Sequence, residues 1–583
     1  MSPAEFYTKE ERKVNGVFYT PSFLAEYLAK KVVGYFGNRK IANAIDPACG
    51  DSVLLRALAN ELSTKRKSKP KIFGIDKDIN AIVSSTAKFA NSSFRVFATQ
   101  FIHTDGLFPG NGKSSVEGWL ELRKELKVKN GFDVAISNPP WGAELNGYDP
   151  LALNLNFSLA KGQFDVFDLF VEVILQNLNE NGVYGLILPD SVFSQEQARF
   201  RCLLSKSTTI HLIARLGEKI FPEINRACVI IVGKKTKAKS NHQVDCFRLS
   251  SSYKKKIISN ELTLEVVEKE LSHKVPQSRF YENDNCVFDI DLKTDEQKTF
   301  GKIQNNSVAI QQFVKNTRGA EISKKGIVCQ CPNCKHWMPY PKAKQPKCSS
   351  CKTVLNLDTI STEKIILNHN GIGNIKLKVG EDLYRFTSVS KSWINTLKNG
   401  INYKDLSIYN GDKILVRKTG VGITASLDYE NAITNQVVYI LKLKSAYENK
   451  VSLEFVLAVL NSRAMTYFLI KKFGENEWKS HPYLTQTTLV NLPFPKIDFN
   501  SADAKKLIVR VTKIIRNEIS HSNEKNISKE NDLFIERVVA HFFKLNQTDY
   551  KSIFETLNSS EQLIPIRRLL NCTTKEIFQV NGL

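Results

Sequence analysis

The sequence predicts a doubly wound α/β domain with a mostly parallel sheet, joined to a mixed α+β region and a helical C-terminal segment. Short apolar segments alternate with helical patterns up to about residue 235, as expected for such a sheet. Beyond that point the chain becomes polar, and short strand-like segments and then charged helical patterns follow. The length of 583 residues is also too great for one ordinary domain.

Five apolar segments of the first part are predicted to be buried strands. They cover residues 41–46, 71–76, 132–137, 182–188 and 227–232. Helical spacing of apolar side chains lies between them, most clearly over residues 167–178. A further helix-like run over residues 53–62 follows the first strand.

Changes in composition predict four regions. The α/β domain covers residues 1–245, a linker with some strand content covers 246–298, a second domain covers 299–500, and a charged helical segment covers 501–583. The linker is predicted because the chain becomes rich in Lys and Ser there.

The chain carries a large excess of positive charge. Its 82 lysines and arginines against 59 acidic residues give a formal net charge of +23. Such an excess favours a polyanionic partner, with nucleic acid as the first candidate and a lysine-rich surface that serves only solubility as the alternative. The sequence has no run of 18 or more apolar residues and a polar N-terminal segment, so we expect a cytoplasmic protein without a membrane partner.

Polar turns at three successive strand ends indicate a cofactor site. The first strand ends in Asp46-Pro47-Ala48-Cys49-Gly50, directly before a helix, where backbone N–H groups can approach a ligand closely. The second strand ends at Asp76, whose carboxylate can accept hydrogen bonds from two ribose hydroxyls. A third strand end carries Asp105. Each motif alone is as well explained by a turn or a helix cap, but the ordered series favours a cofactor.

A proline-rich turn, Asn138-Pro139-Pro140-Trp141, follows the strand at 132–137. The prolines stiffen the turn and remove N–H donors, so it presents the Asn138 side-chain oxygen and the Pro139 carbonyl as acceptors. Two acceptors on the hydrogens of a planar amino group favour a more nucleophilic nitrogen and stabilise the charge that develops as it attacks a methyl sulfonium. Trp141 offers a ring on which a flat base can stack. A structural loop with a buried Trp is the alternative interpretation.

In order and content these motifs resemble the amino-DNA methyltransferases of the TaqI type and the methyltransferase part of single-chain type IIG restriction-modification enzymes. By this resemblance Tyr19, Thr20 and Pro21 lie over the methionine end of the cofactor. Residues 46–50 match the cofactor loop, Asp76 the acid that binds the ribose, and Asp105 the residue that meets the cofactor adenine. Phe221 matches an aromatic residue that stacks on the flipped target base from the side opposite Trp141.

The resemblance implies a Rossmann-like class I S-adenosylmethionine-dependent methyltransferase domain followed by a target-recognition domain, over residues 299–500. It also implies methylation of N6 of a flipped adenine in double-stranded DNA, as the modification component of a restriction-modification or related system. The choice of adenine N6 over cytosine N4 comes from the resemblance and not from the chemistry of the motif. The expected location is the cytoplasm of a prokaryotic cell, in association with the nucleoid.

Two positions depart from the family pattern. Ser52 stands where the family usually has a second glycine, which matters if the position has a positive φ. Gly106 follows Asp105 where some relatives carry an aromatic residue, so the residue that packs on the cofactor adenine is not identified. About fifteen residues precede the first motif and no acid–acid–Lys nuclease pattern is found, so we expect methylation without cleavage. A separate restriction nuclease subunit is then a candidate partner.

Four of the eleven cysteines form two closely spaced pairs. Cys331 and Cys334 are followed, after thirteen residues, by Cys348 and Cys351, which is the spacing of a structural zinc site with four thiolates. The short basic segment between the pairs is typical of a zinc ribbon, which we place at 327–355. A redox pair and a chance arrangement are the alternatives. We favour a structural role for the ribbon over contact with DNA.

Candidate DNA-binding residues lie in a basic loop after a predicted strand. They are Arg417, Lys418 and Gly420, and for each of them a solvated surface is the ordinary alternative. Two other functions stay open. Methyltransferases of RNA or of protein glutamine also carry Asn-Pro-Pro-aromatic motifs, although they usually lack a long specificity-like region. The second open function is a non-catalytic DNA-binding subunit that retains the fold. Its best support is Ser52, which replaces a glycine of the family's cofactor loop.

Overall fold

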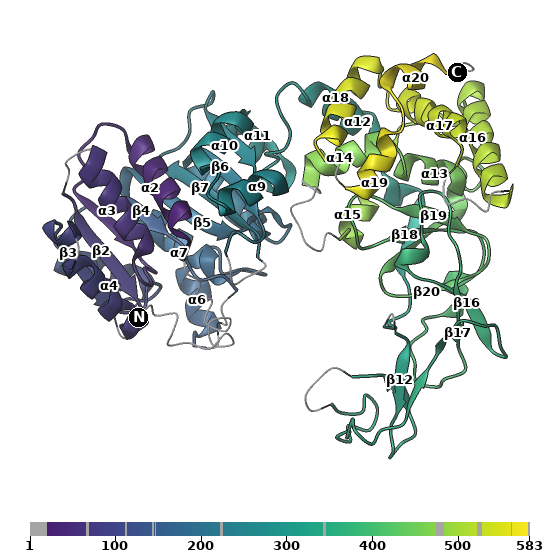
Figure 1. Cartoon of the computed structure of the whole chain (residues 1–583), viewed down its shortest axis with the longest axis horizontal. Helices are drawn as coiled ribbons and strands as arrows, with labels where there is room; N and C mark the ends of the chain where they lie inside the picture. Colours follow the sequence, from purple (N-terminus) through teal and green to yellow (C-terminus); the bar gives the residue numbers. More distant parts are fainter. Residues whose placement is uncertain are drawn as a thin grey trace. The chain divides into compact units, whose positions relative to one another are not determined.

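The chain forms two compact units in the computed structural model (Figure 1). The first comprises the described residues up to Thr294, and the second comprises the described residues from Asp295 onward. The structure describes residues 20–65, 69–91, 93–110, 114–142, 145, 147–221, 226–323, 325–341, 346–473, 483–521, 527–560 and 563–580.

The first unit is built on a sheet of nine described strands, in the spatial order β3-β2-β1-β4-β5-β7-β6-β8-β9. Their bounds are β1 Asn43–Asp46, β2 Lys71–Asp76, β3 Thr99–His103, β4 Phe132–Ser137, β5 Leu178–Pro189, β6 Thr209–Gly217, β7 Cys228–Lys234, β8 Gln243–Arg248 and β9 His273–Pro276. The strands from β3 to β5 are parallel neighbours, and β7 runs antiparallel to both β5 and β6. The strand order reverses between β1 and β4, and ligands bind at the carboxyl ends of strands beside such a reversal.

Helices alternate with these strands. Their bounds are α2 Ser22–Phe36, α3 Val53–Lys65, α4 Ile79–Ala90, α5 Ser115–Glu125, α6 Pro150–Asn156, α7 Val166–Asn177, α8 Ala198–Ser207, α9 Ser251–Ile258, α10 Leu264–Leu271 and α11 Gln277–Glu282. The mostly parallel α/β domain predicted from the apolar periodicity is therefore confirmed. α7 begins with a capping box in which the side chains of Asp165 and Asp168 each accept a backbone N–H at the helix start.

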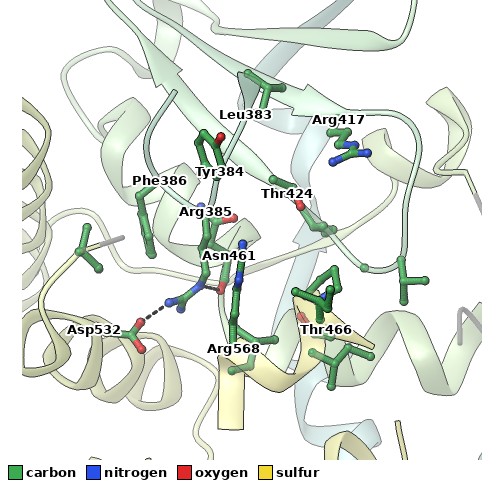
Figure 2. Close-up of a pocket in the computed structure, with 18 of the residues that line it drawn as sticks. Leu383, Tyr384, Arg385, Phe386, Arg417, Thr424, Asn461, Thr466, Asp532 and Arg568 are labelled. Atoms are coloured by element: carbon green, nitrogen blue, oxygen red, sulfur yellow. Dashed lines mark hydrogen bonds and ion pairs between the residues drawn. The ribbon is translucent and has the colours of Figure 1, made fainter. Parts of the chain in front are cut away.

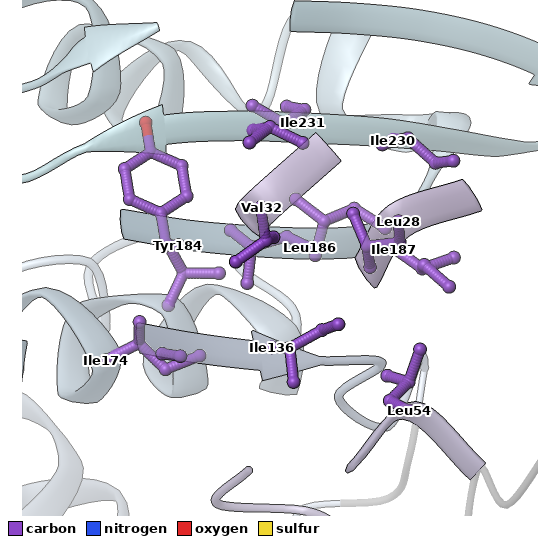
Figure 3. Close-up of a cluster of buried hydrophobic side chains, with 14 of the residues drawn as sticks. Leu28, Val32, Leu54, Ile136, Ile174, Tyr184, Leu186, Ile187, Ile230 and Ile231 are labelled. Atoms are coloured by element: carbon purple, nitrogen blue, oxygen red, sulfur yellow. The ribbon is translucent and has the colours of Figure 1, made fainter. Parts of the chain in front are cut away.

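The core of the first unit lies where α2 crosses the central strands (Figure 3). Leu28 and Val32 of α2 lie against Leu186 of β5 and Ile231 of β7, and all four side chains are buried. Gly185 of β5 permits this close approach, because an added Cβ would lie 2.3 Å from Cγ2 of Val32. The glycine in the predicted strand thus sets how closely the helix packs on the sheet.

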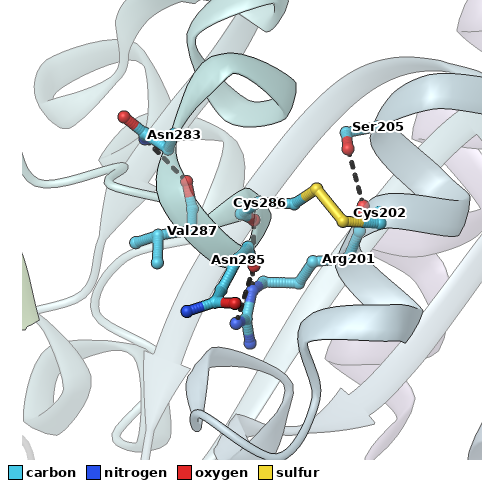
Figure 4. Close-up of a disulfide and its surroundings, with 7 residues drawn as sticks. All are labelled: Arg201, Cys202, Ser205, Asn283, Asn285, Cys286 and Val287. Atoms are coloured by element: carbon cyan, nitrogen blue, oxygen red, sulfur yellow. Dashed lines mark hydrogen bonds between the residues drawn. A yellow bond between two sulfur atoms is a disulfide. The ribbon is translucent and has the colours of Figure 1, made fainter.

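Residues 246–298 are not the linker that the sequence predicted. β8 pairs with β6, β9 pairs with β8, and three helices follow or lie between them, so this segment extends the sheet of the first unit up to Thr294. A disulfide joins Cys202 of α8 to Cys286 of the 3-10 helix η4 (Asp284–Cys286), with 5.3 Å between the Cα atoms (Figure 4). Beside it, the buried Arg201 guanidinium donates to the carbonyls of Cys286 and Asn285, each at 3.1 Å. These contacts fix the segment to α8.

The second unit combines small sheets with a helical part. Its helices are α12 Gln297–Asn305, α13 Leu453–Leu460, α14 Arg463–Phe473, α15 Gln486–Val490, α16 Ala502–His521, α17 Lys529–Phe542, α18 Gln547–Asn558, α19 Ile564–Arg567 and α20 Thr574–Gln579. Its strands are β10 Ser307–Ala309, β11 Val314–Arg318, β12 Ile327–Gln330, β13 Trp337–Pro339, β14 Thr362–Lys364, β15 Ile366–Leu367, β16 Asn374–Lys378, β17 Ser392–Asn395, β18 Lys413–Arg417, β19 Ala425–Asp428, β20 Ile433–Thr434, β21 Val438–Leu443 and β22 Pro493–Pro495. They form the described sheets β10-β22, β11-β21-β18-β19, β13-β12-β14 and β15-β17-β16-β20.

The apolar helices α13 and α14 form the centre of the helical part. α16 and α17 pack on α13, and α18 packs on α14, so residues 501–583 share a compact unit with the sheets. Arg463 of α14 is fully buried and forms ion pairs with Asp532 and Glu536 of α17 at 2.8 Å and 3.0 Å. Among the described residues no single helix is long and apolar enough to span a membrane; only the bent pair α13 and α14 passes by length and composition, and its side chains are buried.

Candidate functional site

The polar residues singled out at strand ends lie at one edge of the sheet of the first unit. Asp46 ends β1, Asp76 ends β2, Asp105 follows β3 and Asn138 follows β4. Because these four strands are parallel neighbours, their carboxyl ends lie side by side. The structure therefore brings the predicted cofactor residues and the Asn-Pro-Pro-Trp turn together.

Asp46 connects the cofactor loop to the turn that carries Asn138. Its Oδ1 accepts a hydrogen bond from the Ser137 hydroxyl at 2.7 Å and another from the Ala48 N–H at 3.0 Å. Burial of the carboxyl raises the pKa of Asp46 to about 7; the charge of Asp76 adds to this, and the two hydrogen bonds oppose it. A displacement of either loop would therefore break a buried contact with the other.

Asp76 holds the glycine of the cofactor loop. Its Oδ2 accepts the Gly50 N–H at 2.8 Å, and its Oδ1 accepts the Asp78 N–H at 2.9 Å. Burial raises the pKa of the Asp76 carboxyl, and these backbone hydrogen bonds oppose the rise. Gly50 has φ +49°, and an added Cβ would have no heavy atom within 4 Å. The loop thus borders open space on the side where a Cβ would project.

Ser52 adopts the conformation that glycine would adopt more readily. Its φ is +63° and its side chain is fully buried. The hydroxyl donates to the carbonyl of Asp51 at 2.6 Å, which partly satisfies it within the turn. The position does require a positive φ, and the backbone reaches it with serine.

Gly106 cannot be replaced by the aromatic residue of some relatives. An added Cβ would lie 2.2 Å from the carbonyl oxygen of Pro47. The neighbouring Asp105 instead accepts a hydrogen bond from the Tyr148 hydroxyl at 2.6 Å, and the ring of Tyr148 lies 6.1 Å from that of Phe108. Tyr148 and Phe108 are thus aromatic residues beside Asp105 that no sequence motif had identified.

The Asn-Pro-Pro-Trp turn is held at both ends. At its start, Nδ2 of Asn138 donates to Oγ1 of Thr20 at 3.1 Å, which places the side-chain oxygen on the other side of the carboxamide. At its end, the Trp141 carbonyl accepts from the guanidinium of Arg226 at 2.9 Å. The next N–H, that of Gly142, donates to Oδ1 of Asp165 at 2.7 Å. Thr20 thus contacts the Asn-Pro-Pro-Trp turn directly.

The two aromatic residues predicted to enclose a base contact each other in this structure. The rings of Trp141 and Phe221 meet edge to face, with centroids 5.3 Å apart, and each side chain is 2% exposed. A base stacked between two rings needs them about 7 Å apart, twice the contact distance of about 3.5 Å. The rings are in direct contact here, so a base could stack between them only after they separate. Of the remaining cofactor residues, Pro21 precedes α2, and Tyr19 lies outside the described residues.

The four clustered cysteines converge on one point in the second unit. Their sulfur atoms all lie within 4.8 Å of one another, and the pairs Cys331–Cys351 and Cys334–Cys348 are each 3.6 Å apart. Zinc–sulfur bonds of about 2.3 Å in a tetrahedron place the sulfurs about 3.8 Å apart, so the cluster has the size of a zinc site. The hydroxyl and N–H of Thr353 lower the pKa of Cys351 to about 5, which favours the thiolate.

The candidate DNA-binding residues lie at the end of β18 and in the loop that follows. Arg417 lines a cavity of about 590 Å³ in the second unit, together with Tyr384, Phe386 and Arg568 (Figure 2). The Arg417 Nε is buried without a hydrogen-bond partner among the described residues. Gly420 has φ +115°, and Lys418 lies over the ring of Tyr483 at 5.9 Å. The loop is therefore tied to residue 483 while Arg417 faces the cavity.

The strand order and the polar turns at the carboxyl ends of β1 to β4 define a doubly wound α/β protein with a candidate ligand site at that edge of the sheet. A family model described as N-6 DNA Methylase matches residues 4–318, which is more than half of the chain. The chain therefore belongs to the N-6 DNA methylase family. A second model, described as TaqI-like C-terminal specificity domain, matches residues 376–494. The resemblance to TaqI-type enzymes is confirmed.

Curated relatives match parts of the chain. "Type II methyltransferase M.BanIII" of Aneurinibacillus aneurinilyticus is 26% identical over 221 residues, 36% of this chain and 37% of the relative. "Type II methyltransferase M.VspI" of Vibrio sp. (strain 343) is 28% identical over 298 residues, 46% of this chain and 62% of the relative. The match thus spans less than two thirds of either relative. Among solved structures, the type IIL restriction-modification enzyme MmeI in complex with DNA shares the fold, with a TM-score of 0.55, 12% identity, and coverage of 97% of this chain and 82% of that one.

Proposed function

We propose that the chain is a site-specific DNA methyltransferase that transfers a methyl group from S-adenosylmethionine to N6 of a flipped adenine in double-stranded DNA. It would act as the modification component of a restriction-modification or related system. One observation supports this most: the Asn138 turn is hydrogen-bonded to the cofactor loop through Ser137 and Asp46, and to Thr20 through its own amide. An acceptor for an amino group is thereby positioned next to a cofactor loop.

The residues at the ends of β1 to β3 fit an adenosyl cofactor. The space beside Gly50 leaves room for a ligand against the loop backbone. The carboxyl of Asp76 suits ribose hydroxyls, and that of Asp105 suits an adenine amino group. Thr20 and Pro21 would lie at the methionine end, by the family pattern. When bound, S-adenosylmethionine supplies an electrophilic methyl group on a sulfonium.

Asn138 and Pro139 perform the chemistry that this chain contributes. The side-chain oxygen of Asn138 and the carbonyl of Pro139 accept the two N–H groups of the target amino group, which orients its nitrogen and stabilises the positive charge that it acquires. No general base is required before transfer, because the proton leaves to water afterwards. Trp141 and Phe221 would hold the flat base once the rings separate.

The second unit would bind DNA and select the site. The TaqI-like match covers β16 to β22, and the loop after β18 carries Arg417, Lys418 and Gly420. Arg417 and Lys418 suit phosphate and base-edge contacts. A zinc ion on Cys331, Cys334, Cys348 and Cys351 would hold together a ribbon that buries little apolar surface of its own.

The test is to identify the acceptor. Purified protein is incubated with methyl-labelled S-adenosylmethionine and, separately, with duplex DNA, RNA and a protein mixture, and the labelled DNA is digested to nucleosides. Label in N6-methyldeoxyadenosine is the expected result. Label in N4-methylcytosine would retain the amino chemistry and refute the choice of adenine. Label in RNA or glutamine would support the alternative substrate classes, and binding of DNA without any transfer would support the non-catalytic subunit.

A further inference from the structure

The zinc-ribbon segment has an uneven distribution of charge. Residues 322–357 contain seven lysines and no aspartate or glutamate. Acidic residues make up 59 of the 583 residues of the chain, so about three or four would be expected in a segment of this length. Within these bounds, which include β12 (Figure 1), no acidic residue neutralises the lysines; the neighbouring strand β14 carries Glu363, which forms an ion pair with Lys398 instead.

Four of these lysines belong to the part of residues 322–357 that the structure describes. Lys325, Lys335, Lys347 and Lys352 are all exposed. None of them forms an ion pair with a described residue, although Lys352 donates to the Ser349 carbonyl at 3.0 Å. Elsewhere in the same unit lysines do find acidic partners, as in the buried pair of Lys413 with Asp428 at 2.5 Å. The four lysines of residues 322–357 are thus free of acidic partners among the described residues, as several other exposed lysines of the unit also are.

Lys335 and Lys352 occupy equivalent places in two similar turns. Each directly follows the second cysteine of a pair, has a positive φ (+57° and +63°), and donates its N–H to the carbonyl of the first cysteine, at 3.0 Å and 3.1 Å. The left-handed conformation is strained for a residue other than glycine. The backbone alone would thus favour glycine at both places, although four other described lysines of the chain adopt the same conformation.

Both lysines border the same four-sulfur cluster. Their Cα atoms are one virtual bond, about 3.8 Å, from the Cα atoms of Cys334 and Cys351. A zinc ion with four thiolates has a net charge of −2. One alternative is therefore that the lysines do no more than balance this negative charge. Together with Lys347, which precedes Cys348, they supply three positive charges at the cluster, which leaves a surplus. Lys325 adds a fourth on the same small subdomain.

We propose that the ribbon is a DNA-contact surface that binds backbone phosphates of duplex DNA through Lys335 and Lys352, supported by Lys325 and Lys347. This rests on the proposed function, because duplex DNA is taken as the polyanion. The zinc site would then position both turns, so that the lysines meet the phosphates in a fixed geometry. Since phosphates carry no sequence information, the ribbon would add affinity and leave the choice of site to other residues.

The test is the double variant Lys335→Gly/Lys352→Gly in the full-length protein, which removes two charges and keeps the backbone conformation accessible. DNA affinity is measured by fluorescence anisotropy from 0.05 to 0.3 M salt. Loss of two phosphate contacts should reduce the slope of log K against log salt by about 1.8 and weaken binding roughly sixty-fold at 0.1 M salt. Lys335→Arg/Lys352→Arg should retain both slope and affinity. Zinc content, measured by mass spectrometry, should stay at one per chain in all variants.

Lys544→Gly is the matched control, because Lys544 is also exposed and also has a positive φ (+58°), but lies at the end of α17, away from the ribbon in sequence. It should change the affinity less than twofold. An unchanged salt slope in the double variant, or an equal loss in Lys544→Gly, would overturn the proposal. A loss of zinc with unchanged DNA binding would assign the lysines to the metal site instead. If the Gly variant loses its fold, Lys335→Gln/Lys352→Gln serves the same comparison.

Methyl transfer by the wild-type protein is measured separately, at low salt with saturating DNA. If the double variant shows the predicted change of slope but the wild type transfers no methyl group, the proposed function is refuted and the ribbon contact stands. If the wild type methylates DNA normally but the double variant shows no change of slope, the ribbon contact is refuted and the proposed function stands.

Discussion

Thr20→Val tests whether the hydroxyl of Thr20 positions the amide of Asn138. The two residues lie 118 positions apart, and Nδ2 of Asn138 donates to Oγ1 of Thr20 at 3.1 Å. Valine keeps the shape of threonine and removes the acceptor. Without it, the carboxamide can rotate, and its oxygen no longer faces the target amino group in every molecule.

The expected size of the effect follows from one hydrogen bond at a half-buried side chain. Such a bond contributes about 0.5–1.5 kcal/mol net. If this orientation energy is lost only at the transition state, the methyl-transfer rate falls by roughly twofold to tenfold. Thr20→Ser keeps the hydroxyl and should stay within about twofold of the wild type.

Single-turnover methylation with saturating DNA and cofactor measures the rate, and calorimetry with S-adenosylmethionine measures cofactor affinity. A lower rate with unchanged cofactor affinity in Thr20→Val, restored in Thr20→Ser, supports the positioning role. Methyl transfer by Thr20→Val at the wild-type rate would refute the positioning role. Loss of cofactor affinity alone in both variants would refute it too, since Thr20 would then act only on the cofactor.

Three further perturbations test other contacts. Gly106→Ala places a Cβ 2.2 Å from the Pro47 carbonyl, so the cofactor loop must move and cofactor affinity should fall at least tenfold in calorimetry, whereas Gly34→Ala, with nothing within 4 Å, should leave it unchanged. Burial raises the pKa of Asp46 to about 7, so the unfolded state loses its proton first and this carboxyl lowers the free energy of unfolding as pH rises from about 4 to 7. Asp46→Asn should reduce that decline in urea titrations of the first unit; an unchanged pH dependence would contradict it. Cys348→Ser should abolish bound zinc in mass spectrometry, and retention of one zinc per chain would exclude the four-cysteine site.

The strand-end motifs of the first unit could be predicted because each is local. Asp46, Asp76 and Asn138 each follow a short apolar run directly, and the parallel sheet that these runs predict brings their ends together without further information. Two hydrogen bonds of the site join residues that are distant in sequence: Ser137 donates to Asp46, and Asn138 donates to Thr20. No local motif could predict them.

The linker prediction failed because β8 lies near the edge of the sheet and buries only part of its length. Val244, Cys246 and Phe247 are buried, but the lysines and serines around them dominate the composition. The disulfide of Cys202 with Cys286 spans 84 positions, and neither residue has a neighbouring cysteine that would suggest a pair. Pairing between scattered cysteines follows from tertiary structure and could not be predicted from their spacing.

The four-cysteine cluster shows the opposite case. Two Cys-x-x-Cys pairs thirteen residues apart predict that four sulfur atoms converge, because each pair lies in a tight turn and a metal ion bound by both pairs would set the distance between the turns. The positive φ of Lys335 and Lys352 was not predicted. Glycine is the usual residue at a positive φ, and a lysine in the sequence gives no sign of it.

We propose that the side-chain oxygen of Asn138 accepts a hydrogen bond from the amino group that receives the methyl group. Asn138→Ala is compared with the wild type and with Asn60→Ala, which changes an exposed asparagine on α3 of the same unit. Methyl transfer to duplex DNA and S-adenosylmethionine affinity are measured on all three. We predict that Asn138→Ala binds the cofactor with wild-type affinity and forms no detectable N6-methyladenine, while Asn60→Ala behaves as wild type. Formation of N6-methyladenine by Asn138→Ala at the wild-type rate would contradict the claim.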